Sequence, residues 1–170
     1  MKSVVLYAYP PEPDGLSLQG HYLMQGMREN GEAVMPCDRD DSFEKEWLFS
    51  HFKPHVAIGV GFWGDTPRMI LSPQKHSIHA VPWFLADGWV ANYHNVLNDL
   101  PLIVVTSNWT KETYIRDGVN GDNIHVLPIG IDTALFKPLP SNDLGRLKMR
   151  EMLGIRPDEK VILTAGGDAT

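Results

Sequence analysis

Short apolar runs alternate with helical segments along most of the chain, and this alternation constrains the fold more than any other feature of the sequence. The first run, SVVLYA at residues 3–8, is typical of a strand buried on both faces of a sheet. Further strands are predicted at 32–36, 56–60, 80–85, 102–106 and 124–127, and helices at 18–30, 43–52, 90–97 and 108–117, with an ambiguous segment at 68–78. Strands that alternate with helices favour an α/β fold, here a doubly wound, mostly parallel, Rossmann-like sheet.

Capping residues mark the ends of several predicted helices. Ser107 is the expected N-cap of the helix that follows it, and Gly118 comes after the last turn of that helix. Asp143 is the expected N-cap of a later helix, which Gly154 ends. In the helix at 43–52, the apolar pattern predicts three inward-facing residues: Phe43, Trp47 and Leu48.

Composition and charge exclude several classes of function. The net charge is −6 and the 15 Lys and Arg residues are scattered, whereas a nucleic-acid-binding protein gathers its basic residues on one face. Cys37 is the only cysteine, so an intrachain disulfide and a four-cysteine zinc site are excluded, and we expect a semi-buried residue at the end of a strand. The seven histidines lack the spacing of metal ligands, so no metal site is predicted.

The sequence suggests neither a targeting segment nor a membrane span. The apolar run near its start is too short for a signal peptide, and no segment approaches the roughly 20 apolar residues of a spanning helix. We therefore expect a cytoplasmic protein, with peripheral membrane contact left open.

Four loops that follow predicted strands should meet at one edge of a parallel sheet, where ligands bind in open α/β folds. They are residues 10–20, 61–67, 86–95 and 106–108. In the first loop, Gly15, Ser17 and Gly20 are candidate substrate-binding residues, because glycine lets the backbone approach a ligand and a helix N-terminus favours phosphate. The alternative interpretation of these residues is an ordinary turn.

A carboxylate after the fourth predicted strand is the candidate catalytic residue. Asp87 lies in the sequence ADGW, where it would face the ligand edge and could bind or polarise an acceptor hydroxyl. The alternative is a turn aspartate placed before Gly88. His94, in the same loop region, is a further candidate for acceptor binding.

Three tryptophans lie in or beside the edge loops. Trp63, Trp83 and Trp89 could each present an apolar face to a sugar ring and donate a hydrogen bond from the indole N–H. Core packing is the alternative and is the commoner fate of tryptophan. We favour Trp63 as the substrate contact and keep Trp83 as a second candidate.

The segment PIGIDTALFKP at residues 128–138 follows a strand ending in serine, a helix and a second strand. This arrangement resembles the signature of the family 4 glycosyltransferases, in which the segment reads P-N-G-V-D-x-x-x-F-x-P; Ile129 stands in place of the usual Asn. The ending VILTAGG at 161–167 is similar to the passage into the C-terminal domain of that family. The early glycine loop and helix also resemble the family, with Asp14 where a first glycine is usual and Glu32 where His is usual.

The resemblance implies the N-terminal half of a GT-B fold and a retaining transferase that uses a nucleotide-sugar donor without a metal or other cofactor. In that family the N-terminal domain holds an acceptor, here an unidentified hydroxyl compound, and the C-terminal domain holds the donor. Gly166 and Gly167 would face the donor phosphates in a full-length enzyme. The fragment alone is expected to be inactive, because most of the donor domain is missing.

The expected organisation is an acceptor-binding domain at 1–139, a linker and helix at 140–158, and the first strand of a truncated C-terminal domain at 159–170. Two alternative functions stay open: a non-catalytic module of the same fold that binds a sugar or nucleotide, and a GT-B epimerase. The apolar strand at 161–165 lacks its own sheet, so pairing with a second copy of the chain is a further alternative.

Overall fold

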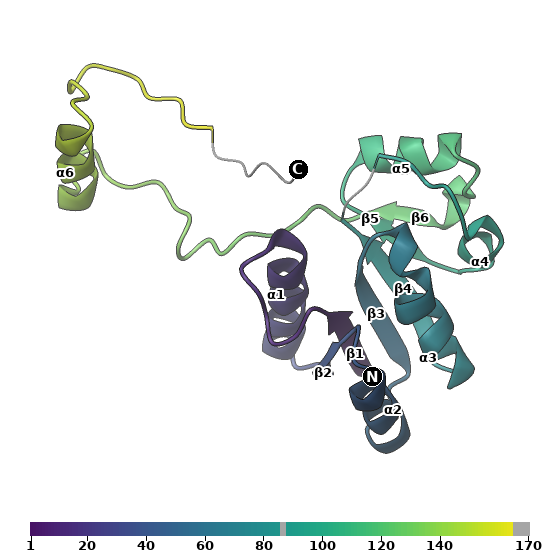
Figure 1. Ribbon diagram of the computed structural model, residues 1–170. Helices are drawn as coiled ribbons and strands as arrows, with labels where there is room; N and C mark the ends of the chain where they lie inside the picture. The colour runs from purple at the N-terminus through teal and green to yellow at the C-terminus, as the bar shows by residue number, and fades with distance from the viewer. Residues whose placement is uncertain (86–87, 165–170) are drawn as a thin grey trace. The chain divides into compact units, whose positions relative to one another are not determined.

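The computed structural model describes residues 1–85 and 88–164 of the chain (Figure 1). The chain divides into two compact units, residues 1–131 and residues 132–170. The division falls after Ile131, earlier than the boundary at 139 that the sequence suggested. The first unit contains the whole sheet.

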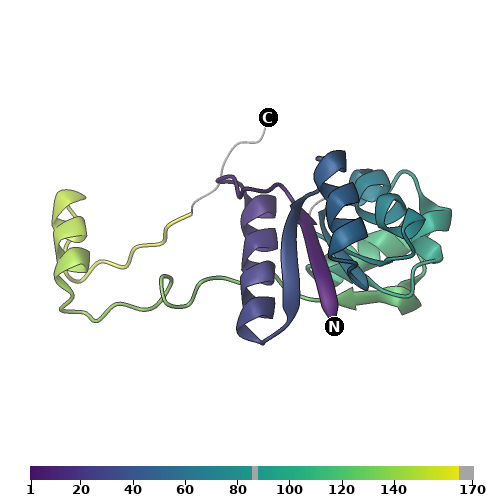
Figure 2. The same ribbon diagram turned by 90° about the horizontal axis from the view of Figure 1, so that it is seen from below.

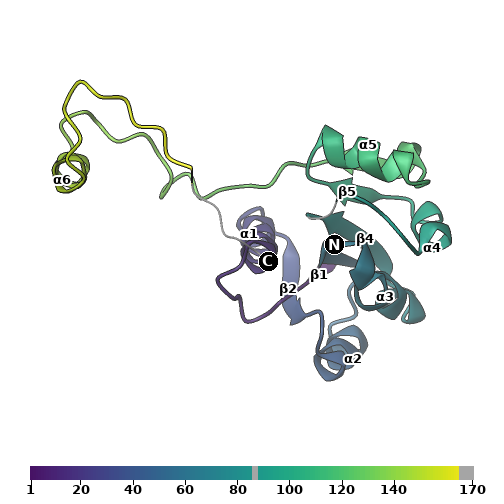
Figure 3. The same cartoon turned by 45° about the horizontal axis from the view of Figure 1, so that its top comes forward.

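Six parallel strands form one sheet in the order β2-β1-β3-β4-β5-β6. Every ladder is parallel, so the predicted doubly wound, Rossmann-like α/β fold is confirmed. The strands agree with the predicted ones to within a few residues and are β1 (Lys2–Tyr7), β2 (Ala33–Asp38), β3 (Val56–Gly61), β4 (His79–Phe84), β5 (Ile103–Val105) and β6 (Ile124–Val126). Figure 3 shows β2 with α1 at one end of this arrangement and β5 with α5 at the other.

Helices cover both faces of the sheet (Figure 2). Successive residues of β1 point to opposite faces: Val5 and Tyr7 pack with Met24 of α1, whereas Val4 and Leu6 pack with residues of α2. A third cluster packs α5 and the segment after β3 on the strands from β4 to β6. The helices of this unit are α1 (Gly15–Glu29), α2 (Ser42–His51), η1 (Trp63–Asp65), η2 (Pro67–Leu71), α3 (Ser72–Lys75), α4 (His94–Asn98), α5 (Asn108–Arg116) and η3 (Gly121–Asn123).

The inward face of α2 was predicted wrongly at two of its three positions. Phe43 is 88% exposed and Trp47 is 58% exposed, and only Leu48 is buried. The buried stripe instead runs through Lys45, Leu48 and Phe49. Lys45 can be buried because its ammonium group donates to the carbonyl of Arg39 at 2.5 Å, and desolvation lowers its pKa.

Two helical segments are shorter or less regular than expected. The helix predicted at 90–97 begins only at His94, after Tyr93, whose φ of 64° places it in the left-handed region. The ambiguous segment at 68–78 forms a π-helical turn, η2, which runs directly into α3. The predicted cap of α5 is confirmed, because the hydroxyl of Ser107 accepts from the N–H of Thr110 at 3.1 Å.

The second unit contains one helix in its described part, α6 (Leu144–Met152). As predicted, Asp143 caps it by accepting from the N–H of Arg146 at 2.8 Å, and Gly154 ends it with a φ of 66°. Residues 159–164 carry no strand, and residues 165–170 lie outside the described part. The strand expected from residue 159 onward therefore stays a prediction.

No helix in the described part of the chain combines the length and the apolar character needed to cross a membrane.

Candidate functional site

The carboxyl edge of the sheet brings together three segments that are far apart in the sequence. They are the loop and helix start after β1, the turn after β3, and the segment after β6. Because all six strands are parallel, the segments that follow them leave the sheet at this same edge. Gly15, at the start of α1, and Trp63, in η1, both belong to it.

A pocket of about 300 Å³ opens at the amino end of α1. It is lined by Asp14, Gly15, Leu16, Gln19, Leu85 and Ile129, so it joins α1 to the end of β4 and to the segment after β6. A Cβ atom at Gly15 would meet no other atom within 4 Å, so the backbone there borders open space. Gly15 therefore remains a candidate ligand-binding residue.

Ser17 has a structural position. Its side chain is fully buried, and its hydroxyl donates to the carbonyl of Ala8 at 2.7 Å and accepts from the N–H of Glu12 at 2.8 Å. These two bonds fasten the loop after β1 to α1. A ligand could reach the hydroxyl only by breaking them, so we assign Ser17 to the loop rather than to substrate binding.

Gly20 allows α1 to lie close against β1. A Cβ atom at Gly20 would come within 2.5 Å of the Cβ and Cγ atoms of Tyr7. Tyr7 is fully buried, and desolvation raises its pKa to about 12, so the phenol stays protonated. The glycine is required for helix–strand packing, and the structure does not place it in the pocket.

Trp63 sits at the carboxyl edge beside Trp89. The two indole rings meet edge to face, with centroids 5.2 Å apart. Trp89 is 54% exposed, whereas Trp63 is partly buried against the core around α5. Within the described part of the chain, the indole N–H of Trp63 is buried and has no hydrogen-bond partner. Trp63 thus keeps a free donor and remains a candidate.

Trp83 belongs to the core instead of the site. It is 4% exposed and packs on the α1 face of the sheet. Its indole N–H donates to the carbonyl of Leu127 at 3.2 Å, which fixes the segment that follows β6. Since both its faces and its N–H are occupied within the protein, the interpretation of Trp83 as a substrate contact does not fit this position.

His94 lies at the other edge of the sheet. Its Nε2 atom is 2.8 Å from the carbonyl oxygen of Asp117, at the C-terminal end of α5. A crossover helix returns the chain to the amino edge, so this end of α5 is remote from the carboxyl edge. Val90, four residues before His94, also contacts this end of α5, because the Asp117 carboxylate accepts from the N–H of Val90 at 2.8 Å. His94 is therefore held at the C-terminal end of α5 and does not line the pocket beside α1.

Asp87, the candidate catalytic residue, lies outside the described residues, as do Gly166 and Gly167. The described residues around Asp87 are the buried end of β4 at Phe84 and the position of Gly88, which is close to the exposed ring of Trp109. The role of Asp87 stays a prediction.

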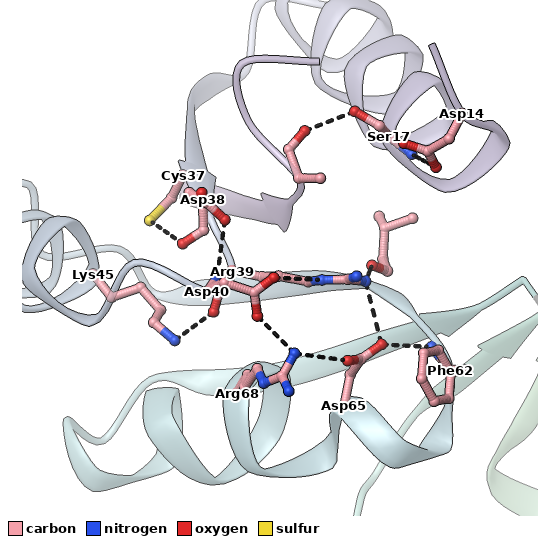
Figure 4. A network of polar contacts seen from close by, with 12 residues as sticks. Asp14, Ser17, Cys37, Asp38, Arg39, Asp40, Lys45, Phe62, Asp65 and Arg68 are labelled. Carbon is pink, nitrogen blue, oxygen red and sulfur yellow. Dashed lines mark hydrogen bonds and ion pairs between the residues drawn. The ribbon is translucent and has the colours of Figure 1, made fainter. Parts of the chain in front are cut away.

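A network of paired charges at the carboxyl edge was missed by the sequence analysis (Figure 4). The buried carboxylate of Asp65 accepts from Arg39 at 3.2 Å and from Arg68 at 3.4 Å, and also caps the N–H of Phe62 at 3.2 Å. Arg68 also pairs with Asp40 at 2.7 Å. The network joins the loop after β2 to the turn that carries Trp63. The charged run at 38–41 was the sequence signal that could have revealed it.

Comparison with known proteins identifies the fold. HepE from Anabaena, solved with UDP, matches with a TM-score of 0.58 at 14% identity, over 91% of this chain and 50% of that chain. The HepE structure solved with UDP and glucose matches with a TM-score of 0.59 over the same shares. The chain has the fold of one half of a GT-B glycosyltransferase. The fold that the resemblance implied is thereby confirmed.

A curated relative of part of the chain is named as a glycosyltransferase. The D-inositol 3-phosphate glycosyltransferase of Xylanimonas cellulosilytica is 35% identical over 81 residues, which are 46% of this chain and 19% of the relative. No protein-family profile matches the chain. The chain thus spans half of the length of HepE and about a fifth of the length of the curated relative.

One further contact of this GT-B sheet was not anticipated. The side-chain amide of Gln19 donates to the carbonyl of Gly130 at 2.9 Å, and the N–H of Gly130 donates back to the amide oxygen of Gln19 at 3.2 Å. Ile129, in the segment that resembles the family signature, is thereby held against the amino end of α1, where it forms one wall of the pocket. Gln19 gave no signal in the sequence, because a glutamine on a helix is usually a solvated residue.

Proposed function

We propose that this chain is the N-terminal, acceptor-binding half of a retaining glycosyltransferase that moves a sugar from a nucleotide-sugar to a hydroxyl acceptor. The donor is held by a second domain, and the 170-residue chain alone does not catalyse transfer. The acceptor occupies the carboxyl edge of the sheet, in the pocket beside α1.

The pocket is the observation that carries this proposal. Its volume of about 300 Å³ lies at the lower end of the range for small-molecule sites. Leu16, Leu85 and Ile129 supply apolar walls, and Asp14 supplies hydrogen-bond acceptors. A sugar or polyol has the matching character, with C–H faces for the apolar walls and hydroxyls that can donate to a carboxylate.

The likeness to HepE supports a half enzyme. The structural match covers 91% of this chain but only half of HepE. HepE was solved with UDP, with UDP and glucose, and with UDP-glucose. A nucleotide-sugar donor is therefore the class of second substrate that we propose for this chain, bound by the half of the enzyme that the chain does not match.

Assays of the isolated chain test the proposal. The chain should release no UDP from UDP-glucose in the presence of sugars and polyols, and calorimetry should detect no saturable binding of UDP. Release of UDP would mean that the chain is a complete enzyme. Saturable UDP binding without turnover would favour the alternative, a nucleotide-binding module of the same fold.

A further inference from the structure

The carboxylate of Asp14, in the pocket beside α1, accepts hydrogen bonds from the N–H groups that an anionic ligand would otherwise bind. α1 is a helix of 15 residues, and its first N–H groups point toward the carboxyl edge. One oxygen of Asp14 accepts from the N–H of Leu16 at 2.9 Å and from the N–H of Ser17 at 3.0 Å. The partial positive charge at this helix end is therefore already matched by a negative charge of the protein.

The rest of the described lining offers no group that would attract an anion. The six lining residues include no Lys, Arg or His. The hydroxyl of Ser17 is turned away toward Ala8, and the amide of Gln19 is engaged with Gly130 on both its nitrogen and its oxygen. Glu12, in the same loop, adds a second acidic residue.

Two basic residues of the carboxyl edge pair with acidic residues of the protein. Arg39 pairs with the buried carboxylate of Asp65 at 3.2 Å, and Arg68 pairs with Asp40 at 2.7 Å. The whole chain has a net charge of −6. A phosphate or carboxylate entering the pocket would thus approach the carboxylate of Asp14 at close range, and no basic side chain in the described lining would offset the repulsion.

We propose that the carboxylate of Asp14 makes this pocket selective against anionic groups, so that the part of the acceptor seated there is uncharged and bears hydroxyls. The statement that this ligand is the acceptor rests on the proposed function. The selectivity against charge is a property of the pocket alone. Asp14 acts here as a specificity-determining residue: its carboxylate accepts from ligand hydroxyls and repels phosphate.

Two substitutions at Asp14 separate the charge from the cap. Asp14→Asn removes the charge but keeps a side-chain oxygen that can accept from the N–H groups of α1. Asp14→Gly removes both, and glycine is itself tolerated at an N-cap. Each 170-residue variant and the wild-type chain are titrated with inorganic phosphate. The backbone amide shifts of residues 15–17 are followed by NMR. A titration with potassium chloride at matched ionic strength controls for general salt effects.

We expect no saturable phosphate shift at residues 15–17 in the wild type. Asp14→Gly should show a saturable phosphate shift there, with a Kd at least about tenfold below the highest phosphate concentration at which the wild type shows none, and Asp14→Asn should fall between the two. Saturable phosphate binding by the wild type at these residues, or no gain in a folded Asp14→Gly variant, overturns the proposal. If Asp14→Gly loses its folded spectrum, Asp14→Asn decides: a gain supports the proposal and no gain overturns it.

The experiment involves no sugar transfer. A failure of the charge selectivity is therefore distinguishable from a failure of the proposed function, which is tested by UDP release and UDP binding.

Discussion

Gln19 and Gly130 bind each other through two hydrogen bonds although they lie 111 residues apart in the sequence. One bond runs from the side-chain amide of Gln19 to the carbonyl of Gly130, and the other runs from the N–H of Gly130 back to the side-chain oxygen. This pair holds the segment after β6 on α1. With the bond from Trp83 to Leu127, it fixes the last residues of the first unit before the chain continues into the second.

Gln19→Ala should loosen this segment without disturbing the sheet. Because both bonds are exposed, we expect the free energy of unfolding to fall by at most about 1 kcal/mol. The amide of Gly130 should exchange with solvent measurably faster, since it loses its acceptor. Hydrogen exchange followed by NMR measures this directly. Gln25→Ala, on the exposed side of the same helix, is the matched control, and equal exchange of Gly130 in both variants would contradict the contact.

Gly20→Ala should destabilise the protein by about 1–3 kcal/mol, because the added methyl group would lie 2.5 Å from the Cβ of Tyr7. Gly26→Ala is the control within the same helix, since a Cβ at Gly26 would meet nothing within 4 Å. That change should be neutral or stabilising by up to about 1 kcal/mol, because alanine favours helix more than glycine does. Urea denaturation of both variants provides the comparison. A Gly20→Ala variant as stable as the wild type would show that α1 does not pack as described.

The stability of the protein should fall as the pH rises from about 9 toward 12. Cys37 is fully buried, and burial raises its pKa from 9.0 to about 12, with the negative charge of Glu44 as the next cause. The unfolded chain loses this proton first, so the contribution is present below pH 9 and is lost as the pH approaches 12. Tyr7 acts in the same direction above pH 10.

Cys37→Ala separates the two contributions, because it should remove the part of the loss that begins near pH 9 and leave the part due to Tyr7. In the wild type, Ellman's reagent should label the Cys37 thiol only as fast as the protein unfolds locally or globally and exposes that thiol. Rapid stoichiometric labelling of the native protein at neutral pH would contradict the burial of Cys37.

The apolar residues at 161–163 should promote self-association. Val161, Ile162 and Leu163 are 53%, 95% and 85% exposed, and they have no strand partner in the described part of the chain. Ile162→Lys should weaken self-association, because a charge on an unpaired apolar segment opposes pairing between chains. Lys160→Gln, two residues before Ile162, is the control. Sedimentation velocity over a range of concentrations measures the effect, and a wild type that stays monomeric throughout would exclude the pairing.

The sheet was predictable from the sequence because a parallel strand buried on both faces leaves a continuous apolar run, such as that of β1. The buried face of a helix was harder to predict. Phe43 is apolar yet exposed, because the buried stripe of α2 follows Lys45, whose charge is satisfied by a carbonyl of the loop after β2. The identity of a side chain does not reveal such a partner.

The positions of the candidate site residues could be predicted only in part, because strand order places a residue at an edge of the sheet but does not give its partners. The edge position of Gly15 and Trp63 follows from strand order alone, and the structure agrees. Gly20 and Trp83 lie in the same stretches of sequence but face the core, and His94 follows a loop that returns to the amino edge. The hydrogen bonds of Gln19 and Asp65 depend on partners distant in the sequence, so no local pattern predicts them.

An amide NMR titration of the 170-residue chain with a set of uncharged sugars and polyols, and separately with UDP, tests the proposed acceptor site most directly. We expect sugar and polyol binding to shift the amides of Gly15, Leu16, Leu85 and Ile129 at the carboxyl edge, and we expect UDP to produce no saturable shift. Saturable UDP binding, or sugar and polyol shifts that cluster around His94 at the opposite edge and leave the pocket unchanged, would contradict this expectation.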